Sequence, residues 1–264
     1  MSEISYDNDF IKTIFFFFFK NGRHDLLWRK DITPYKILVS EVMLQQTQVE
    51  RVLTKFSFWM KKYPTLASLK KASLTDVLIL WQGLGYQRRA KGLFLVAATQ
   101  TKIPSRYEEL LLLPGVGPYT ASAVTAFAFD TFNEHPLIET NIRTVIIEHF
   151  YGEREVVTDK EIEADLKRLA EHPVVKKHGA RAWYYALMDY GAHLKKNAVS
   201  HNIKSAHYKK QTPYKGSLRE LRAKVLFAIT HKKDIPKDER VEKVLDELTQ
   251  EGFIKKTKKT YSIL

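Results

Sequence analysis

Apolar residues recur at three- and four-residue intervals through most of residues 8–195, and short polar breaks separate the segments. This spacing places apolar side chains on one face of a helix, so it predicts helices of moderate length. The alternation of apolar and polar residues that is typical of half-buried strands is scarce before residue 215. The chain is therefore expected to be mainly all-α. The predicted helical segments are 34–56, 74–81, 91–100, 107–113, 119–129, 141–150 and 180–194.

The pattern changes after residue 195, where a long basic stretch begins. Residues 196–215 contain no acidic side chain and are expected to form an exposed linker. Amphipathic spacing over residues 217–229 and 239–253 predicts two helices, and two apolar stretches around a lysine-rich turn predict a hairpin over residues 253–263. Helices followed by a basic hairpin are the pattern of a small winged-helix-like module. A charged appendage that only adds stability is the alternative.

The composition favours a globular protein that binds a polyanion. The chain has 264 residues, 44% of them apolar, and a formal net charge of +13. Residues 193–264 contribute most of this charge, with 18 Lys and Arg against 8 Asp and Glu. Nucleic acid is the usual partner of so basic a chain, and an anionic membrane surface is the second candidate.

The absence of cysteine excludes disulfides, thiolate zinc sites and cysteine-ligated iron–sulfur clusters. The histidines are scattered without metal-ligand spacing, so no side-chain metal site is expected. The five phenylalanines at 15–19 are too few to span a bilayer, and Asp7 and Asp9 before them are unlike the basic start of a signal peptide. We interpret this run as part of a core helix and expect a cytoplasmic protein without membrane contact.

The segment LPGVGPYTA, residues 113–121, combines two glycines and two prolines between apolar segments. Gly115 and Gly117 allow positive φ and exposed backbone N–H groups, and Pro118 suits the first position of a new helix. Backbone donors beside a helix N-terminus favour an anion. A plain connector between two helices is the alternative.

Two acidic positions are candidates for acid–base chemistry. Glu41, Gln45 and Gln48 would share one helix face, where a carboxylate beside amides could read and protonate a nucleobase. Glu139 precedes Thr140 and Asn141, either of which is a reasonable N-cap, so Glu139 would lie near a helix start. Two acids in different environments can divide the roles of proton donor and electrostatic stabiliser. A solvated helix face and a simple cap are the alternatives.

The glycine turn in WQGLGYQRRAKGL suits contact with DNA bases. Gly83 and Gly85 flank Leu84, and Tyr86 follows as an aromatic tip. An exposed aromatic residue beside basic side chains can insert into a base stack. The basic helix start after it contains Arg88, Arg89 and Lys91.

In combination these segments resemble the helix-hairpin-helix (HhH-GPD) DNA glycosylases, and among them the MutY-type adenine glycosylases. The resemblance covers residues 20–195 and rests on NGRHDLLWRKDITPYKILVSEVMLQQTQVERV, LWQGLGYQRRAKGL, LPGVGPYTASAV, LIETNIRTV and ALMDYGA in this order. It implies a two-lobed helical fold with a DNA cleft between the lobes. The implied divisions are an N-terminal helix packing with the second lobe (1–29), a six-helix barrel lobe with the helix-hairpin-helix (30–135), a second helical lobe (136–195), the basic linker (196–215) and a winged-helix-like tail (216–264).

The resemblance also implies a catalytic site that acts on a nucleotide flipped out of the duplex. Glu41 stands where the family's general acid protonates adenine at N7. Glu139 stands where the family has the aspartate that stabilises the sugar cation, and the neighbouring Asn141 is retained. Tyr119 stands where bifunctional relatives carry a Schiff-base lysine, so β-lyase activity is not expected.

Base and DNA contacts follow from the same resemblance. Trp28 and Arg29 match positions that line the base pocket, and Tyr185 replaces the Gln or Glu that commonly contacts adenine. The LPGVG hairpin would grip a DNA phosphate through its backbone amides, with a monovalent cation at the backbone of Leu113–Gly117. The expected DNA-binding residues are Gln45 and Gln46 near the opposite base, Tyr86 as a wedge beside it, and Thr47, Arg88, Gly115, Val116, Gly117, Lys195 and Lys196.

Two departures from the family shape the functional hypothesis. The four-cysteine loop that normally follows ALMDYGA is absent, so no iron–sulfur cluster and no other cofactor are expected. The remaining residues are too few for the domain that recognises 8-oxoguanine, and the winged-helix-like tail takes its position. The leading hypothesis is a monomeric, monofunctional DNA glycosylase of base excision repair that removes adenine mispaired with 8-oxoguanine or guanine from double-stranded DNA. A thymine or uracil glycosylase of the same fold, acting opposite guanine, and a non-catalytic DNA-binding protein are the alternatives.

Overall fold

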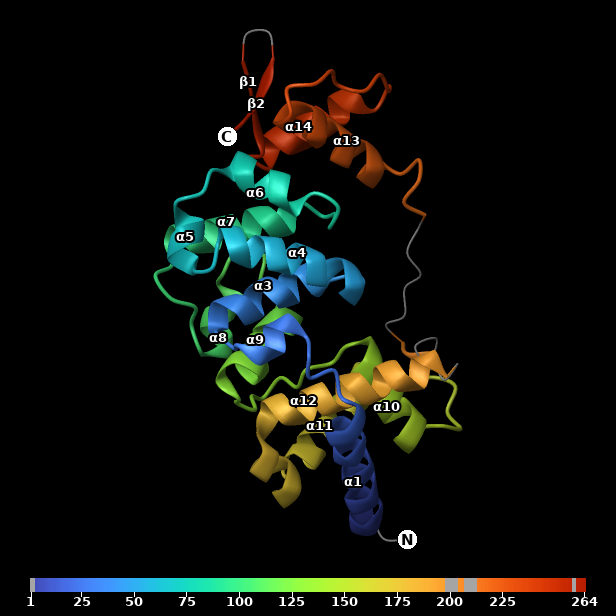
Figure 1. The fold of residues 1–264 in the computed structure, drawn as a ribbon. Coiled ribbons are helices and arrows are strands. Elements are labelled where there is room, and N and C mark those ends of the chain that lie inside the picture. Colours follow the sequence, from blue (N-terminus) through green and yellow to red (C-terminus); the bar gives the residue numbers. More distant parts are fainter. Residues whose placement is uncertain (1–2, 198–203, 207–212, 258–259) are drawn as a thin grey trace. The chain divides into compact units, whose positions relative to one another are not determined.

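The structure, a computed structural model, describes residues 3–197, 204–206, 213–257 and 260–264 and is mostly helical (Figure 1). The prediction of a mainly all-α chain is confirmed. Its elements are α1 (Glu3–Asn21), α2 (Leu27–Lys30), α3 (Pro34–Leu44), α4 (Val49–Lys62), α5 (Leu66–Lys70), α6 (Leu74–Trp81), α7 (Arg88–Thr99), α8 (Tyr107–Leu111), α9 (Pro118–Phe129), α10 (Thr140–Phe150), α11 (Asp159–Ala170), α12 (Pro173–Lys196), α13 (Leu218–Thr230), α14 (Val241–Gln250), β1 (Ile254–Lys256) and β2 (Tyr261–Ile263).

By its contacts the chain divides into two compact units, each built from separate stretches of sequence. The boundaries of these units differ from those of the predicted lobes. Helix α9 contacts α8 and α12 and so belongs to the first unit, and α13 contacts α6, which places the C-terminal tail in the second. The first unit comprises Met1–Glu41, Ile103–Leu112 and Val116–Lys210, and the second comprises Val42–Lys102, Leu113–Gly115 and Gln211–Leu264.

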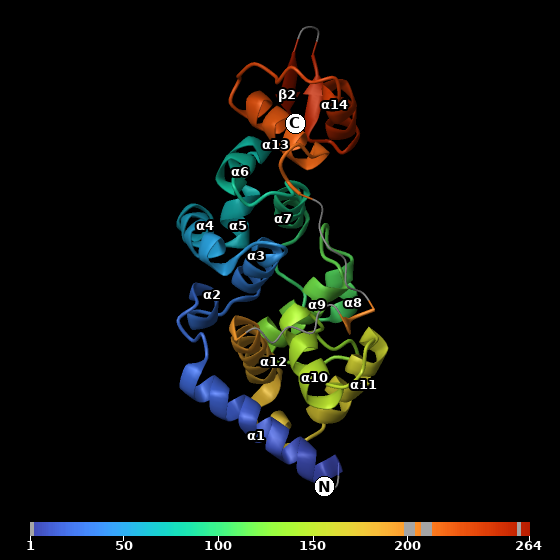
Figure 2. The same ribbon diagram turned by 90° about the vertical axis from the view of Figure 1, so that its right-hand side faces the viewer.

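Helix α12 is the centre of the first unit, with α1 and α10 packed against it (Figure 2). Trp183 of α12 is fully buried, and the ring of Phe15 lies 5.8 Å from it. The five-phenylalanine run lies on α1 but faces both ways, because Phe15 and Phe18 are buried whereas Phe16 and Phe19 are exposed. Among the helices that the structure describes, none is long and apolar enough to cross a membrane.

A backbone kink aligns the part of α12 that carries candidate site residues. Gly179 has φ of +84°, and a Cβ atom there would lie 2.7 Å from Asp130 Oδ1, so the position requires glycine. Asp130 ends α9 in the left-handed conformation and accepts a hydrogen bond from the Arg181 amide (2.8 Å). The Arg181 guanidinium donates to the Phe127 carbonyl in the last turn of α9 (2.6 Å). These contacts hold the later part of α12 against α9.

The second unit has its own core, in which α6 contacts α4 and α7, and α5 contacts α7. Trp59 of α4 and Trp81 of α6 are buried with their rings edge to face at 5.7 Å. The indole N–H of Trp81 donates to the Gly85 carbonyl (2.9 Å), which ties the glycine turn after α6 to this core.

The C-terminal tail contains two helices and a hairpin, as the sequence pattern predicts. Helix α13 contacts α14, β1 contacts α14 and β2 contacts α13. The strands pair antiparallel, with Ile254 opposite Ile263 and Lys256 opposite Tyr261. Phe253 and Ile254 are buried while the next lysines are exposed, so the hairpin closes the apolar side of the tail. The predicted linker over residues 196–215 falls largely outside the described residues.

Candidate active site

Glu41 is a buried carboxyl group in the first unit. It lies in the last turns of α3 with 2% of its surface exposed, and Tyr119 of α9 donates a hydrogen bond of 3.0 Å to its Oε2. Burial raises the pKa of Glu41 to about 7, against the opposing effects of the Tyr119 hydrogen bond and the charge of Arg29. The pKa of Tyr119 is raised well above 10 by burial and by the charge of Glu41, so this phenol keeps its proton and remains the donor. A carboxyl group that titrates near neutral pH is suited to donate a proton.

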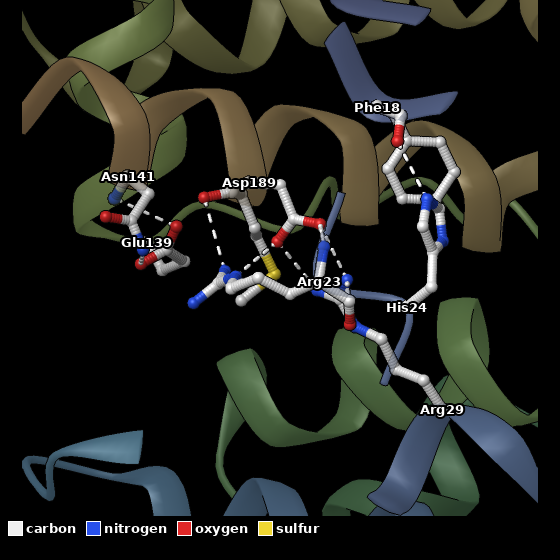
Figure 3. A network of polar contacts seen from close by, with 8 residues as sticks. Phe18, Arg23, His24, Arg29, Glu139, Asn141 and Asp189 are labelled. Carbon is white, nitrogen blue, oxygen red and sulfur yellow. Dashed lines mark hydrogen bonds and ion pairs between the residues drawn. The ribbon is translucent and has the colours of Figure 1, made fainter. Parts of the chain in front are cut away.

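Glu139 is the N-cap of α10, which corrects the prediction that Thr140 or Asn141 has this role. Its extended backbone allows the long side chain to turn back onto the helix start (Figure 3). Oε1 accepts from the amides of Asn141 (2.8 Å) and Ile142 (3.0 Å), and Oε2 accepts from Asn141 Nδ2 (3.1 Å) and the Thr140 hydroxyl (3.2 Å). These donors and the positive end of the helix fix the orientation of the carboxylate.

The two carboxyl groups therefore occupy different environments within one unit. Glu41 is buried with the Tyr119 hydroxyl as a hydrogen-bond donor, whereas Glu139 is surrounded by backbone and side-chain donors. They are close enough to interact, because the charge of Glu139 raises the pKa of Glu41 further. Such a pair can separate the roles of proton donor and charged stabiliser.

Arg29 is held by a buried ion-pair network at Asp189 of α12 (Figure 3). The Asp189 side chain, 1% exposed, accepts from Arg29 Nη1 (2.7 Å) and Nη2 (3.1 Å), and from Arg23 through Nε (2.6 Å) and the backbone amide (2.8 Å). Burial alone would raise the pKa of Asp189, but the hydrogen bonds and charges of the two arginines hold it below its usual value. The sequence pattern assigned no role to Arg23 or Asp189. A single acidic residue inside the apolar segment ALMDYGA was the available signal, because a buried carboxylate needs cationic partners.

Both faces of the Tyr185 ring are covered by other side chains. The ring of Phe127 stacks on it at 4.3 Å and 12°, and the Arg29 guanidinium carbon lies 3.9 Å from its centroid, which places it on the other face. Among the described residues the hydroxyl has no hydrogen-bond partner, although the side chain is buried. Burial and the charge of Glu41 raise the pKa of Tyr185, so the phenol stays neutral close to Glu41. Trp28, in α2, is also buried.

Lys195 lies next to Glu139. Its ammonium group donates to the Thr140 hydroxyl (3.0 Å), which in turn donates to the Glu139 carboxylate. Burial lowers the pKa of Lys195, and the charge of Glu139 opposes this effect. Lys195 is thus half-buried beside the cap of α10, whereas its neighbour Lys196 is exposed.

The predicted single helix over residues 34–56 is wrong. Helix α3 ends at Leu44 and α4 begins at Val49, so Gln45 and Gln48 do not follow Glu41 on one helix face. Gln46 between the helices has φ of +53° and is exposed, and the Thr47 hydroxyl donates to the Gln45 carbonyl (3.2 Å).

Arg89 explains this break. Its guanidinium donates to the carbonyls of Val42 (2.8 Å) and Gln45 (2.7 Å) at the end of α3, and to the Leu84 carbonyl (2.7 Å). It satisfies carbonyls that a longer helix would have used itself. Arg89 lies in the first turn of α7, the basic helix start that the sequence indicates, but its side chain is buried.

The glycine turn presents Tyr86 as expected from the sequence. Gly83, Gly85 and Tyr86 all have positive φ (+89°, +70° and +46°), and Tyr86 is 40% exposed. Arg88 is exposed, and its guanidinium forms a bidentate ion pair with Glu251, with Nε 2.8 Å from Oε2.

The LPGVG hairpin has one left-handed glycine rather than two. Gly115 has φ of +79°, whereas Gly117 has φ of −101° and is the N-cap of α9. Pro118 occupies the first turn of α9, as predicted, and Val116 is buried. Gly92 supports the hairpin, because a Cβ atom there would lie 2.9 Å from the Pro114 carbonyl oxygen. Within the described ranges, no three His, Asp or Glu side chains are grouped to hold a metal ion.

Comparison with known proteins agrees with this arrangement. Residues 39–172 match the HhH-GPD superfamily of base excision DNA repair proteins. The adenine DNA glycosylase of Buchnera aphidicola subsp. Schizaphis graminum is 36% identical over 177 residues, which are 65% of this chain and 50% of that protein. The adenine DNA glycosylase of Mycobacterium tuberculosis is 37% identical over 182 residues, or 66% of this chain and 58% of that protein. The chain thus spans only about half the length of the curated relatives that it matches.

Two solved structures share the fold. A thermostable thymine-DNA glycosylase superimposes with a TM-score of 0.59 at 23% identity, covering 73% of this chain and 88% of that one. A non-covalent endonuclease III–DNA complex gives a TM-score of 0.55 at 17% identity, covering 81% and 93%. With a family match over half of its length, the chain belongs to the HhH-GPD superfamily of base excision DNA repair proteins.

Proposed function

We propose that this chain is a DNA glycosylase that removes a mispaired adenine from double-stranded DNA, with Glu41 as the proton donor. The observation that carries the proposal is the buried Glu41 carboxyl group, whose pKa is raised to about 7 and whose Oε2 accepts from Tyr119. The matched relatives named adenine DNA glycosylases support adenine as the target.

The reaction cleaves the bond between the base nitrogen and C1′ of the sugar. Glu41 transfers its proton to the flipped adenine, so the base leaves as a neutral molecule and positive charge develops on the sugar. The oriented Glu139 carboxylate stabilises that charge. Water then bonds to C1′ and releases a proton to a carboxylate, which leaves an abasic site.

Tyr119 supports a monofunctional enzyme. Its phenol is held as a hydrogen-bond donor to Glu41, and a phenol cannot form a Schiff base with the sugar. We expect base release without strand cleavage, so that the DNA breaks only after alkaline treatment.

Tyr185 is expected to influence which base the enzyme excises. Because both ring faces are covered, the side chain has no stacking surface for a base, and its buried hydroxyl is the group left to contact a base edge. A hydroxyl can donate to a ring nitrogen or carbonyl and can accept from an amino group. This feature keeps thymine or uracil opposite guanine as the second candidate substrate.

The experiment is strand cleavage after alkali with four labelled duplexes, in which A lies opposite 8-oxoguanine, A opposite G, T opposite G or U opposite G. Cleavage confined to the adenine strands supports the proposal. Cleavage of the thymine or uracil strands would keep the chemistry and change the substrate. Binding without cleavage of any duplex would leave a non-catalytic DNA-binding protein.

DNA binding and cofactor content are parts of the same proposal. We expect a monomer whose affinity for duplex DNA falls steeply with salt, because phosphate contacts release counterions. Since the chain has no cysteine, the purified protein should be colourless and free of stoichiometric iron.

A further inference from the structure

Within the second unit, the C-terminal tail (216–264) contacts Tyr86 at the end of the glycine turn (83–86). Arg219 of α13 donates from Nη1 to the Tyr86 hydroxyl at 2.7 Å, and its guanidinium carbon lies 5.8 Å from the centroid of the Tyr86 ring. Arg219 is half-buried, and Tyr86 is the exposed tip of the turn. The tail thus contacts the aromatic side chain itself and not only the helix that follows it.

A second set of contacts fixes the tail to the start of α7. Glu251, at the end of α14, accepts from Arg88 and also from Arg222 of α13. Lys91 Nζ donates to the backbone carbonyls of Glu251 and Gly252, the latter at 2.8 Å. The basic residues that follow Tyr86 are therefore largely engaged by the tail.

The backbone of the turn has an independent support. Arg89 donates to the carbonyls of Leu84 (2.7 Å) and Gly85 (3.2 Å), immediately before Tyr86. Arg89 thus holds the main chain and also lies over the Tyr86 ring, with its guanidinium carbon 5.4 Å from the ring centroid, whereas Arg219 binds the hydroxyl at the tip of the side chain. An exposed side chain that is already ordered loses less conformational entropy when it enters a ligand.

We propose that the C-terminal tail is a positioning device for Tyr86, with Arg219 as the positioning residue, and that it sets the discrimination between bases opposite the target adenine. The inference rests on the proposed function, because Tyr86 is expected to act as the wedge beside the opposite base. The tail thereby contributes to mismatch recognition through the side chain that it orients.

The first test compares single-turnover excision of A opposite 8-oxoguanine with A opposite G. Arg219→Gln and Tyr86→Phe each remove the Arg219–Tyr86 hydrogen bond and should lower the ratio of the two rate constants about ten-fold, the size expected for one charge-assisted hydrogen bond. The double variant should lose no more than either single variant, and Arg219→Lys should recover part of the ratio. Lys224→Gln is the matched control, since it removes one positive charge from the same helix, where Lys224 pairs with Glu220. Its ratio should equal that of wild type.

A second readout does not depend on excision. In the Glu41→Gln background, 2-aminopurine beside the opposite base should brighten on binding as Tyr86 unstacks it. Tyr86→Ala should abolish this signal, Arg219→Gln should weaken it, and Lys224→Gln should leave it unchanged. If no duplex is cleaved, the proposed function fails, but the fluorescence measurement still decides whether Arg219 positions Tyr86. The positioning role of Arg219 would be overturned by equal fluorescence signals from Arg219→Gln and wild type. It would also be overturned if the losses in the ratio of rate constants were additive in the double variant.

Discussion

The Tyr119 hydroxyl donates a hydrogen bond of 3.0 Å to the buried carboxyl group of Glu41. This contact stabilises the charged form of Glu41, while burial destabilises that form more strongly and raises the pKa to about 7. The tyrosine therefore tunes how readily the acid holds its proton.

The rate of excision should consequently depend on pH in a defined direction. The protonated fraction of Glu41 falls as the pH rises through about 7, so the rate at sub-saturating enzyme should decline on the alkaline side. Tyr119→Phe removes an interaction that lowers this pKa, so the alkaline limb should move to higher pH. Rate constants from about pH 5.5 to about pH 9 for both proteins measure the shift. A limb that moves to lower pH in Tyr119→Phe would contradict the assignment.

Glu41 should also reduce the stability of the folded protein above neutral pH. Its pKa is raised in the folded state, so the native protein holds a proton that the unfolded chain has lost between pH 4.5 and 7, and stability falls with rising pH across that window. Glu41→Gln should therefore stabilise the protein by up to about 3 kcal/mol at about pH 8 and have little effect at about pH 4. Denaturant unfolding at both pH values measures this.

Glu139→Gln provides the contrast for that measurement. The amide keeps one acceptor oxygen but loses the charge at the start of α10, so the variant should lose about 1 kcal/mol in the alkaline measurement. The prediction fails if Glu41→Gln lowers the free energy of unfolding in the alkaline measurement, as Glu139→Gln is expected to do. Glu41 would then not be a buried acid that destabilises the fold.

The spacing of apolar residues was enough to predict the helices and strands that neighbouring residues specify. The helical periods of α9, α10, α12 and α13, and the two apolar stretches around the lysine-rich turn of the hairpin, are read from neighbouring residues. The break after α3 could not be predicted this way, because the Arg89 side chain that caps Val42 and Gln45 comes from far along the chain. Glutamate is an unusual N-cap, so helix statistics favoured Thr140 over Glu139.

The candidate site was predictable only where a motif marked it. Glu41 and Glu139 were candidates from the residue pattern and gained their roles from the family resemblance, whereas Tyr119 came from the resemblance alone. The structure brings the three within interaction range. The Arg23–Asp189 pair joins residues 166 positions apart, and no local pattern specifies such a contact. The covered faces of the Tyr185 ring are likewise a tertiary property.

Asp189→Asn tests the network that holds Arg29. Removing the carboxylate leaves a buried guanidinium without its charge partner, so the unfolding free energy should fall by about 3 kcal/mol at neutral pH. The pKa of Asp189 is lowered, so the wild type keeps this contribution above about pH 4 and loses it only in stronger acid. Urea unfolding measures the effect. Asp25→Asn, which breaks the exposed pair with Lys30, should leave the midpoint unchanged, and equal effects of the two variants would argue against the network.

Substitutions of the two glycines in the LPGVG hairpin test stability and DNA binding separately. Gly115 has positive φ, so Gly115→Ala should cost about 1 kcal/mol of stability. Gly117 has ordinary φ and open space where a Cβ atom would lie, so Gly117→Ala should fold normally. If its amide approaches a DNA phosphate, the added methyl group should still weaken duplex binding several-fold at about 0.1 M salt. Unchanged affinity of Gly117→Ala would remove the hairpin from the DNA interface.

The most direct test of the central claim is single-turnover excision of adenine opposite 8-oxoguanine by wild type and Glu41→Gln, with DNA affinity measured in parallel. Glu163→Gln, which breaks an exposed pair with Lys167, is the control. We predict that Glu41→Gln loses at least about 100-fold in rate while it binds DNA as tightly as wild type, because only the proton donor is removed. Excision by Glu41→Gln at the rate of wild type and of Glu163→Gln would contradict the assignment of Glu41 as the acid.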